Sequence, residues 1–359
     1  MNRSVIRPQI RDLGAYEVPD AHGMVKLDAM ENPYPLPAPL QQELAQILSQ
    51  LAFNRYPEPQ PKLLRELLYQ QMGVPHQAGL LLGNGSDEII QMIALATAQP
   101  GAVMLGVEPS FVMFRMIATF VGMEFVGIPL NAQFQLDEQP LLQAIGRHQP
   151  AVLFLAYPNN PTGNCFDAAL LRTVLQQTSG LVVVDEAYFP FTDQSFLPEL
   201  LNYPNLLVMR TLSKLGLAGI RLGFLAGPRA LVDQLEKVRL PYNISVPDQA
   251  VATYMLRHLS VLQEQTGRIR QQREVLRSQL ALLEGVTVYP SEANFLLLRV
   301  ASAARIFDAL RHRGILIKNL GKAHALLADC LRVTVGSPEE NQQFLTAFQN
   351  VLARTVFSD

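Results

Sequence analysis

The chain has 359 residues, 49% hydrophobic and 17% charged, which is enough apolar material for a large core and enough length for two or three domains. A formal net charge of −2 does not point to nucleic acid or to an anionic membrane surface as a partner. Its two cysteines do not make a disulfide framework, and its N-terminus has no signal-like apolar stretch, so we expect a cytoplasmic protein without a membrane helix. The six histidines show no metal-ligand spacing, so we expect no metal site.

Prolines shape the first sixty residues. They cluster at residues 33–39 and again at residues 57–61, and proline disfavours the interior of a helix. Only one helix is predicted between the two clusters, at about residues 40–51. This part of the chain is therefore expected to be an irregular segment that precedes the main fold.

Short apolar runs alternate with helical patterns between residues 80 and 228. Strands apolar on both faces and separated by helices indicate a mostly parallel sheet covered on both sides, which is a three-layer α/β sandwich. Ligands bind outside the carboxyl ends of the strands in such sheets. The predicted strands are residues 102–107, 124–128, 151–156, 181–184, 206–209 and 222–226, with helices predicted at 87–97, 110–121 and 167–177.

The first strand end with unusual chemistry reads Leu-Leu-Leu-Gly-Asn-Gly-Ser-Asp-Glu over residues 80–88. Ser86 is a good helix N-cap, and the free backbone N–H groups at a helix start bind anions. A dinucleotide-binding fingerprint would need a third glycine where Glu88 stands. The pattern fits either an anion site or an ordinary capped turn.

The second strand end reads Ala-Tyr-Pro-Asn-Asn-Pro-Thr-Gly over residues 156–163. Polar turn residues between two prolines specify one rigid loop. The loop is either a plain β-turn or a device that fixes an amide side chain toward a ligand. We favour the second interpretation because the loop follows a strand predicted near the centre of the sheet.

The third strand end reads Leu-Val-Val-Val-Asp-Glu-Ala-Tyr over residues 181–188. Carboxylates here could hold Mg²⁺ in a nucleotide hydrolase, but the GxxxxGK[ST] loop that such an enzyme requires is absent from the sequence. A carboxylate in this place could instead hold a proton on a heterocyclic nitrogen, as pyridoxal phosphate requires. The alternative is a solvated carboxylate at a strand end.

The fourth strand end, residues 210–221, places a single lysine, Lys214, in a stretch of small and apolar residues. A desolvated lysine has a depressed pKa and becomes a nucleophile toward carbonyls. Ser213 and Arg221 can bind a phosphate, and the arginine can do so in bidentate fashion. A lone lysine without such neighbours would be a solvated surface group.

The last third of the chain indicates an α+β region. Two long helices end near residue 283, and strands are predicted at 286–289, 295–300, 315–317 and 331–335, with helices at 303–313 and 338–353. We therefore expect an N-terminal segment, residues 1–45, that packs with a small domain. Residues 46–270 would form a large cofactor-binding domain, and residues 271–359 the small C-terminal α+β domain.

Together these motifs resemble the fold-type-I pyridoxal-phosphate aminotransferases, and among them the histidinol-phosphate aminotransferases. The shared motifs are Gly-Ser-Asp-Glu, Pro-Asn-Asn-Pro-Thr-Gly, Asp-Glu-Ala-Tyr and Thr-Leu-Ser-Lys, in that order across residues 85–214. The likeness covers nearly the whole chain, because it extends to residues 31–34 and 55–57 in front and to residues 290–295 and 331–336 behind.

The resemblance implies a role for each matching residue at the cofactor. Lys214 would form the Schiff base with pyridoxal phosphate and move the proton during transfer. Asp185 would pair with the pyridine nitrogen, and Asn160 and Tyr188 would hydrogen-bond the phenolic oxygen. The cofactor phosphate would be bound around Gly85 by the backbone amides of Ser86 and Asp87, with Ser213 and Arg221.

The resemblance also implies a homodimer with shared sites. Tyr56 matches a tyrosine that reaches the cofactor phosphate of the neighbouring subunit. Arg332 matches the arginine that grips the anionic group of the substrate, and Tyr16 and Asn32 would line the same pocket. Lys318 occupies a place where many relatives have an arginine for the substrate phosphate.

Three features depart from the family pattern. Phe111 stands over the cofactor ring where the family often has tyrosine, so the stacking surface is kept and a hydroxyl is lost. Lysine in place of arginine at position 318 keeps the charge but not the bidentate fork. The interval from Lys214 to Arg221 is one residue shorter than the commonest form, which leaves the contact of Arg221 open.

The reaction that the resemblance implies is reversible amino transfer in histidine biosynthesis. L-Histidinol phosphate and 2-oxoglutarate would give imidazole acetol phosphate and L-glutamate. An aromatic amino-acid aminotransferase and a threonine-phosphate decarboxylase are alternatives, because a fold does not settle a substrate. A third alternative is a non-enzymatic binding or regulatory protein of the same fold. Such proteins commonly carry an added DNA-binding segment, and we expect this alternative less because the sequence shows no basic N-terminal extension.

Overall fold

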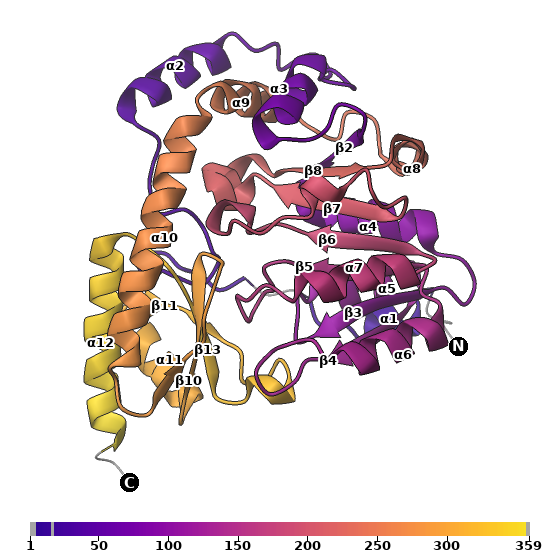
Figure 1. Cartoon of the computed structure of the whole chain (residues 1–359). Helices are drawn as coiled ribbons and strands as arrows, with labels where there is room; N and C mark the ends of the chain where they lie inside the picture. Colours follow the sequence, from indigo (N-terminus) through magenta and orange to yellow (C-terminus); the bar gives the residue numbers. More distant parts are fainter. Residues whose placement is uncertain (1–4, 16–17, 357–359) are drawn as a thin grey trace.

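The computed structural model of the chain describes residues 5–15 and 18–356, and its centre is a seven-stranded sheet (Figure 1). The strand order is β2-β8-β7-β6-β5-β3-β4, and β8 alone runs antiparallel to its neighbours. The strands are β2 (Gly79–Asn84), β3 (Val103–Glu108), β4 (Glu124–Pro129), β5 (Val152–Ala156), β6 (Leu181–Asp185), β7 (Leu206–Thr211) and β8 (Leu222–Gly227). The predicted mostly parallel sheet is therefore confirmed.

Helices cover both faces of this sheet because its strands are apolar on both faces. Along β5, Leu153 and Leu155 belong to one buried core, and Phe154 belongs to the other. Helices α3 (Lys62–Met72), α6 (Glu138–His148), α7 (Ala168–Gln177) and α9 (Val246–Arg257) contribute to the first core. Helices α4 (Gly85–Thr97), α5 (Met113–Val121) and α8 (Arg229–Leu235) contribute to the second.

A second, antiparallel sheet with the order β12-β13-β10-β9 lies beside α10 (Leu259–Ala281), the long helix that joins both parts of the molecule (Figure 1). Leu276 and Leu280 of α10 pack in the core of this sheet together with Leu27 from the N-terminal segment. The remaining elements are α1 (Pro8–Arg11), β1 (Val25–Lys26), α2 (Ala38–Ser49), β9 (Val286–Val288), β10 (Phe295–Val300), α11 (Ala303–Arg311), β11 (Ile315–Leu316), β12 (Lys318–Asn319), β13 (Cys330–Thr334) and α12 (Pro338–Val356).

The N-terminal segment joins the smaller part of the molecule through β1, which pairs in parallel with β11. The predicted boundary between residues 270 and 271 falls inside α10, whose residue Leu262 packs in the core of the large sheet. The three predicted domain ranges stay predictions. None of the helices in the described ranges combines the length and the apolar character needed to span a bilayer.

One predicted cap is wrong. Ser86 lies in the first turn of α4, and Asn84 is the N-cap residue. The chain turns at Gly85, whose φ of +76° glycine adopts without strain, so the helix begins as soon as the strand ends.

Candidate active site

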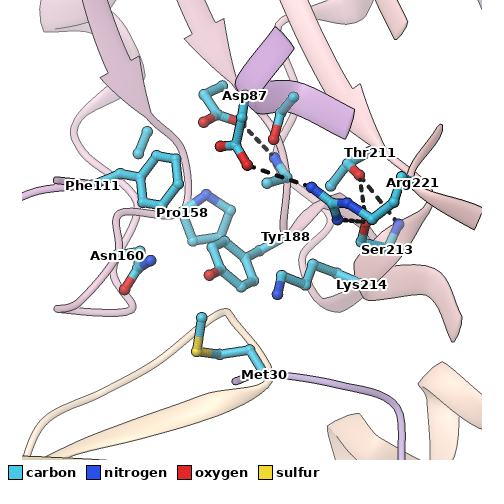
Figure 2. Close-up of a pocket in the computed structure, with 14 residues that line it drawn as sticks. Met30, Asp87, Phe111, Pro158, Asn160, Tyr188, Thr211, Ser213, Lys214 and Arg221 are labelled. Atoms are coloured by element: carbon cyan, nitrogen blue, oxygen red, sulfur yellow. Dashed lines mark hydrogen bonds and ion pairs between the residues drawn. The ribbon is translucent and has the colours of Figure 1, made fainter. Parts of the chain in front are cut away.

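A cavity opens at the carboxyl ends of β5, β6 and β7, beside the start of α4 (Figure 2). It holds about 560 Å³ of empty space, part of it open to solvent, and its wall mixes apolar side chains with a few converging polar groups, as small-molecule sites do. The sequence-predicted residues that line it are Ser86, Asp87, Phe111, Asn160, Asp185, Tyr188, Ser213, Lys214 and Arg221. Strand ends far apart in the sequence thus bring together the groups predicted from the four motifs.

Lys214 projects into this cavity from the short helical turn Ser213–Leu217 that follows β7 (Figure 2). Its Nζ donates a hydrogen bond to the carbonyl oxygen of Ala29, at 2.9 Å. Burial, followed by the positive charges of Arg332 and Arg221, lowers the pKa of Lys214 to about 8. About a tenth of this amine is therefore unprotonated at pH 7, far more than for a lysine of ordinary pKa, and the unprotonated form is the nucleophile toward a carbonyl.

Asp185, at the end of β6, lines the cavity with its carboxylate. Only 4% of the residue is exposed, and one carboxylate oxygen accepts a hydrogen bond from the backbone N–H of Ala187, at 3.0 Å. Burial raises the pKa of Asp185 to about 7. No lysine or arginine in the described ranges forms an ion pair with it, so its ionised form calls for a cationic partner within the cavity.

The neighbouring carboxylate, Glu186, serves the structure instead. It is fully buried and forms an ion pair of 2.8 Å with the buried Arg210. Its oxygens also accept hydrogen bonds from the hydroxyl of Ser195 and from the backbone N–H of Phe196. Alternation along the strand places this side chain on the face opposite to Asp185.

An anion cradle lies where α4 begins. The first N–H groups of a helix have no acceptor within the helix, and here they adjoin Arg221 and Ser213. The Nη1 of Arg221 donates to the hydroxyl of Ser213 at 3.3 Å, and the hydroxyl of Thr211 donates to the same oxygen at 3.0 Å. A Cβ at Gly85 would lie 2.6 Å from Nη2 of Arg221, so only glycine leaves room for this arrangement.

The carboxylate of Asp87 adjoins the cradle. One of its oxygens lies 3.4 Å from Nη2 of Arg221, and the other is buried without a hydrogen-bond partner. Burial raises the pKa of Asp87, and the charge of Arg221 opposes that rise. The cradle therefore contains a cation that is only loosely neutralised by the protein and remains available to an anion.

The same cavity has a slot suited to an aromatic ring, on the side away from the cradle. Phe111 and Pro158 stand at one side of the cavity, and Tyr188 lies between them and Lys214 (Figure 2). Phe111 packs edge-on against Phe114, with ring centroids 5.6 Å apart. Such packing fixes the orientation of the wall and leaves its face to a ligand.

A second cavity shares Met30, Phe111 and Asn160 with the first and continues to Lys318 and Arg332. The two cationic residues face each other across β12 and β13. Arg332 is 7% exposed and donates to the Oδ1 of Asn160 at 2.5 Å and to the carbonyl of Asp28 at 2.9 Å. Positive charge thus concentrates beside the ring slot.

Two of the remaining predicted site residues lie outside both cavities, and a third is not described by the structure. The amide of Asn32 donates to the carbonyl of Leu215 and to the side chain of Gln265, so it braces the turn behind Lys214 instead of lining either cavity. Tyr56 is 79% exposed and stacks on Tyr242, with centroids 4.5 Å apart. Tyr16 lies outside the described residues. The roles predicted for these three residues stay predictions.

Some lining residues were missed by the sequence reasoning. Thr211 belongs to a quoted motif, and its position two residues before Ser213 was a usable signal. The sequence around Met30 contains no comparable signal, because its place in the cavity wall depends on a backbone φ of +54° that the fold imposes. Pro158, Ala156 and Ala187 also line the cavity.

Comparison with known proteins identifies the family. The sequence model described as aminotransferase class I and II matches residues 22–348. The chain belongs to this aminotransferase family. One relative, histidinol-phosphate aminotransferase 2 of Cupriavidus pinatubonensis, is 55% identical over 96% of the chain and 95% of its own length. Another, histidinol-phosphate aminotransferase 1 of Ralstonia nicotianae, is 53% identical over 98% of the chain and 95% of its own length.

A solved structure agrees with the fold of this aminotransferase. The histidinol-phosphate aminotransferase of Sinorhizobium meliloti, in complex with pyridoxal-5′-phosphate, superposes with a TM-score of 0.87 at 23% identity and covers 98% of each chain. The predicted fold-type-I architecture, a three-layer sandwich with a smaller α+β part, is thereby confirmed.

The cofactor of this aminotransferase is pyridoxal phosphate, and the donor set of the first cavity fits it. The cradle would hold the phosphate, and the slot beside Phe111 would hold the ring. Asp185, which is buried and forms no ion pair with the residues that the structure describes, would hold the proton on the ring nitrogen. Lys214 would bind the aldehyde, and Asn160 and Tyr188 line the wall where the phenolic oxygen would lie.

Proposed function

We propose that this aminotransferase is a histidinol-phosphate aminotransferase of histidine biosynthesis. It would convert L-histidinol phosphate and 2-oxoglutarate reversibly into imidazole acetol phosphate and L-glutamate. The observation that carries the proposal is the pair Lys318 and Arg332, placed in a cavity that joins the cofactor cavity. The names of relatives that are half identical over nearly the whole chain support the same substrate.

The residues of the two cavities divide the work of amino transfer. Pyridoxal phosphate, when bound, supplies an aldehyde and an electron-withdrawing ring that stabilises negative charge at the amino carbon of the substrate. Lys214, whose pKa is lowered to about 8, takes the proton from that carbon and holds it for return. Asp185 keeps the ring nitrogen protonated.

Arg332 has to serve two anions in turn, because histidinol phosphate has no carboxylate on its amino carbon. It would bind the phosphate of histidinol phosphate in one half-reaction and a carboxylate of glutamate in the other. A guanidinium suits both anions, because its fork of donors matches the oxygens of either group. Lys318, a compact point charge, would add attraction for the more highly charged phosphate without demanding one geometry.

We expect Arg332→Ala to impair both half-reactions and Lys318→Ala to weaken mainly the reaction with histidinol phosphate. The loss at Lys318 should be about 1–3 kcal/mol, as for the removal of a charged hydrogen-bond partner. Stopped-flow absorbance of the bound cofactor measures each half-reaction separately. Lys322→Ala, which removes an exposed lysine four residues away, is the matched control. Equal losses for glutamate and histidinol phosphate in Lys318→Ala would contradict a phosphate-selective pocket.

A screen of amino donors tests the proposed substrate. The unmutated protein is mixed with L-histidinol phosphate, threonine phosphate, phenylalanine and tyrosine, and the absorbance of the cofactor is followed. Among these amino donors, histidinol phosphate should give the highest apparent second-order rate constant for the half-reaction. A preference for phenylalanine or tyrosine would indicate an aromatic aminotransferase, and release of carbon dioxide from threonine phosphate would indicate a decarboxylase. Either result would overturn the proposed substrate.

We further propose a cytoplasmic homodimer in which Tyr56 reaches the cofactor phosphate of the partner subunit. Large apolar side chains that are exposed at interface-like patches often mark association surfaces. Exposed residues of this kind near Tyr56 are Phe53, Leu240 and Tyr242. Both cysteines are free, which agrees with a reducing compartment.

Hybrid dimers test whether Tyr56 acts across the interface. When a Lys214→Ala subunit pairs with a Tyr56→Phe subunit, one site of the dimer has both native groups and the other has neither. We expect such hybrids to exceed the summed activity of the two parental homodimers, provided that Tyr56→Phe alone impairs the enzyme. Activity equal to that sum would show that Tyr56 does not act in the partner's site.

A further inference from the structure

The wall of the second cavity contains a residue that neither the sequence motifs nor the predicted mechanism uses. His324 lines this cavity together with Lys318 and Arg332. It directly precedes the short helical turn Ala325–Leu327. This turn is held firmly, because Leu327 is buried in the core of the large sheet and the carbonyl of Leu326 accepts a hydrogen bond of 2.7 Å from Arg299. The imidazole is thus presented from a fixed backbone.

The contact that His324 makes with its own turn determines which ring nitrogen carries the proton. The backbone N–H of Leu326 donates to Nδ1 of His324, at 3.1 Å. A nitrogen that accepts a hydrogen bond has no proton, so the neutral ring has its N–H at Nε2. The edge of the imidazole that remains for a ligand in the cavity therefore carries a hydrogen-bond donor.

Phosphate needs more donors than a carboxylate does, because it has three terminal oxygens instead of two. Arg332 already commits one N–H of each terminal nitrogen to Asn160 and to the carbonyl of Asp28. Lys318 adds a single ammonium group. Glu108, the carboxylate in the same cavity wall, is paired with Arg115 at 2.6 Å, which offsets its repulsion of an anion.

We propose that His324 is a specificity-determining residue whose Nε2–H donates to the phosphate of the substrate. The inference rests on the proposed function and deepens it. It assigns His324 to the half-reaction with histidinol phosphate alone, because the smaller carboxylate of glutamate leaves this third donor unused. His324 thereby contributes to the discrimination between phosphorylated and unphosphorylated amines.

His324 has two roles that substitutions can separate. Its Nε2–H is the proposed donor to the phosphate, and its Nδ1 caps the helical turn Ala325–Leu327 by accepting from the N–H of Leu326. His324→Asn keeps an oxygen near the position of Nδ1, where asparagine is a favoured capping residue, but removes the donor at Nε2. His324→Gln places an amide N–H near the position of Nε2 and gives up the short cap. Thermal unfolding of the holoenzyme, followed by circular dichroism, shows whether either variant disturbs the fold.

The measured quantity is the ratio of kcat/KM for L-histidinol phosphate to that for L-histidinol, which lacks the phosphate. In His324→Asn this ratio should fall about tenfold or more, as for the loss of one hydrogen bond to a charged group, and the glutamate half-reaction should not change. His324→Gln should keep most of the ratio. An unchanged ratio in His324→Asn, or an equal loss for both amines, would overturn the inference.

Failure of the proposed function is read separately, from the unmutated enzyme. Absence of reaction between the unmutated enzyme and histidinol phosphate would overturn the proposed function and, with it, the role of His324. A reactive unmutated enzyme whose phosphate preference survives in His324→Asn would overturn the role of His324 alone.

Discussion

Lys214→Ala should abolish amino transfer, with a loss of roughly 10³-fold or more, because the variant has no amine to bind the cofactor aldehyde or to carry the proton. The protein should stay folded, since within the described part of the chain Lys214 hydrogen-bonds only to the carbonyl of Ala29, and its charged form is disfavoured by burial. Steady-state turnover with histidinol phosphate and 2-oxoglutarate measures the loss, and circular dichroism checks the fold.

The matched control for Lys214→Ala is Lys62→Ala, which removes an exposed lysine at the start of α3. It should retain the activity of the unmutated enzyme. Substantial turnover by Lys214→Ala with its fold intact would show that another group moves the proton, and the assignment of the site would then be wrong.

Asp185→Asn should still bind the cofactor but lose about 10²-fold or more in turnover, because a neutral amide does not hold the ring nitrogen protonated. The two side chains have nearly the same shape, so the hydrogen bond from the backbone N–H of Ala187 can be kept. The rate of each half-reaction measures the effect. Turnover close to that of the unmutated enzyme would mean that the carboxylate has a different task.

In the cofactor-free protein, Asp185→Asn should raise the free energy of unfolding at neutral pH, although it lowers turnover in the holoenzyme. The pKa of Asp185 is raised by burial from 3.8 to about 7, so its stabilising contribution is complete below pH 4 and is lost as the pH rises through 7. Asp185→Asn does not lose stability in this pH range, because asparagine does not titrate. Its unfolding free energy, relative to that of the unmutated protein, should therefore increase between pH 4 and pH 8, by up to about 4 kcal/mol.

Chemical denaturation of both cofactor-free proteins at the two pH values measures this change. Carboxylates distant from Asp185 titrate alike in the two proteins, so the difference reports on Asp185 together with its electrostatic coupling to the neighbouring Asp87. Bound cofactor should reduce the pH dependence, because it brings the cation that the buried carboxylate lacks. A difference that stays constant from pH 4 to pH 8 would show that Asp185 does not bury an uncompensated charge.

The sequence was most informative where local pattern and burial coincide. The apolar run from Val152 to Ala156 reads as a strand buried on both faces, and the structure places it between two helical layers. The polar residues that follow such runs converge by topology, so Asn160, Asp185 and Lys214 could be assigned to one site from the sequence, and the structure places all three in one cavity. The predicted helix start at Ser86 was less accurate, because the positive φ of Gly85 lets the helix begin directly after the strand.

Contacts between distant segments could not be predicted in the same way. The hydrogen bond from Arg332 to Asn160 joins residues 172 positions apart, and no local periodicity encodes it. The contact between Lys214 and the carbonyl of Ala29 depends on how the N-terminal segment returns to the cavity. The assignment of a proton to Nε2 of His324 depends on the hydrogen bond that Nδ1 accepts from the backbone N–H of Leu326, which is seen only in the structure. Such features come from tertiary structure, which overrides what a short sequence window specifies.

The attachment of the cofactor to Lys214 is the central claim, and borohydride reduction tests it most directly. Reduction converts the reversible link between the cofactor aldehyde and an amine into a stable one, after which proteolysis and mass spectrometry locate the modified lysine. We predict that the phosphopyridoxyl group is found on the peptide containing Thr211-Leu212-Ser213-Lys214, at Lys214. A label on any other lysine, or no label in a protein that binds the cofactor, would contradict this account of the site.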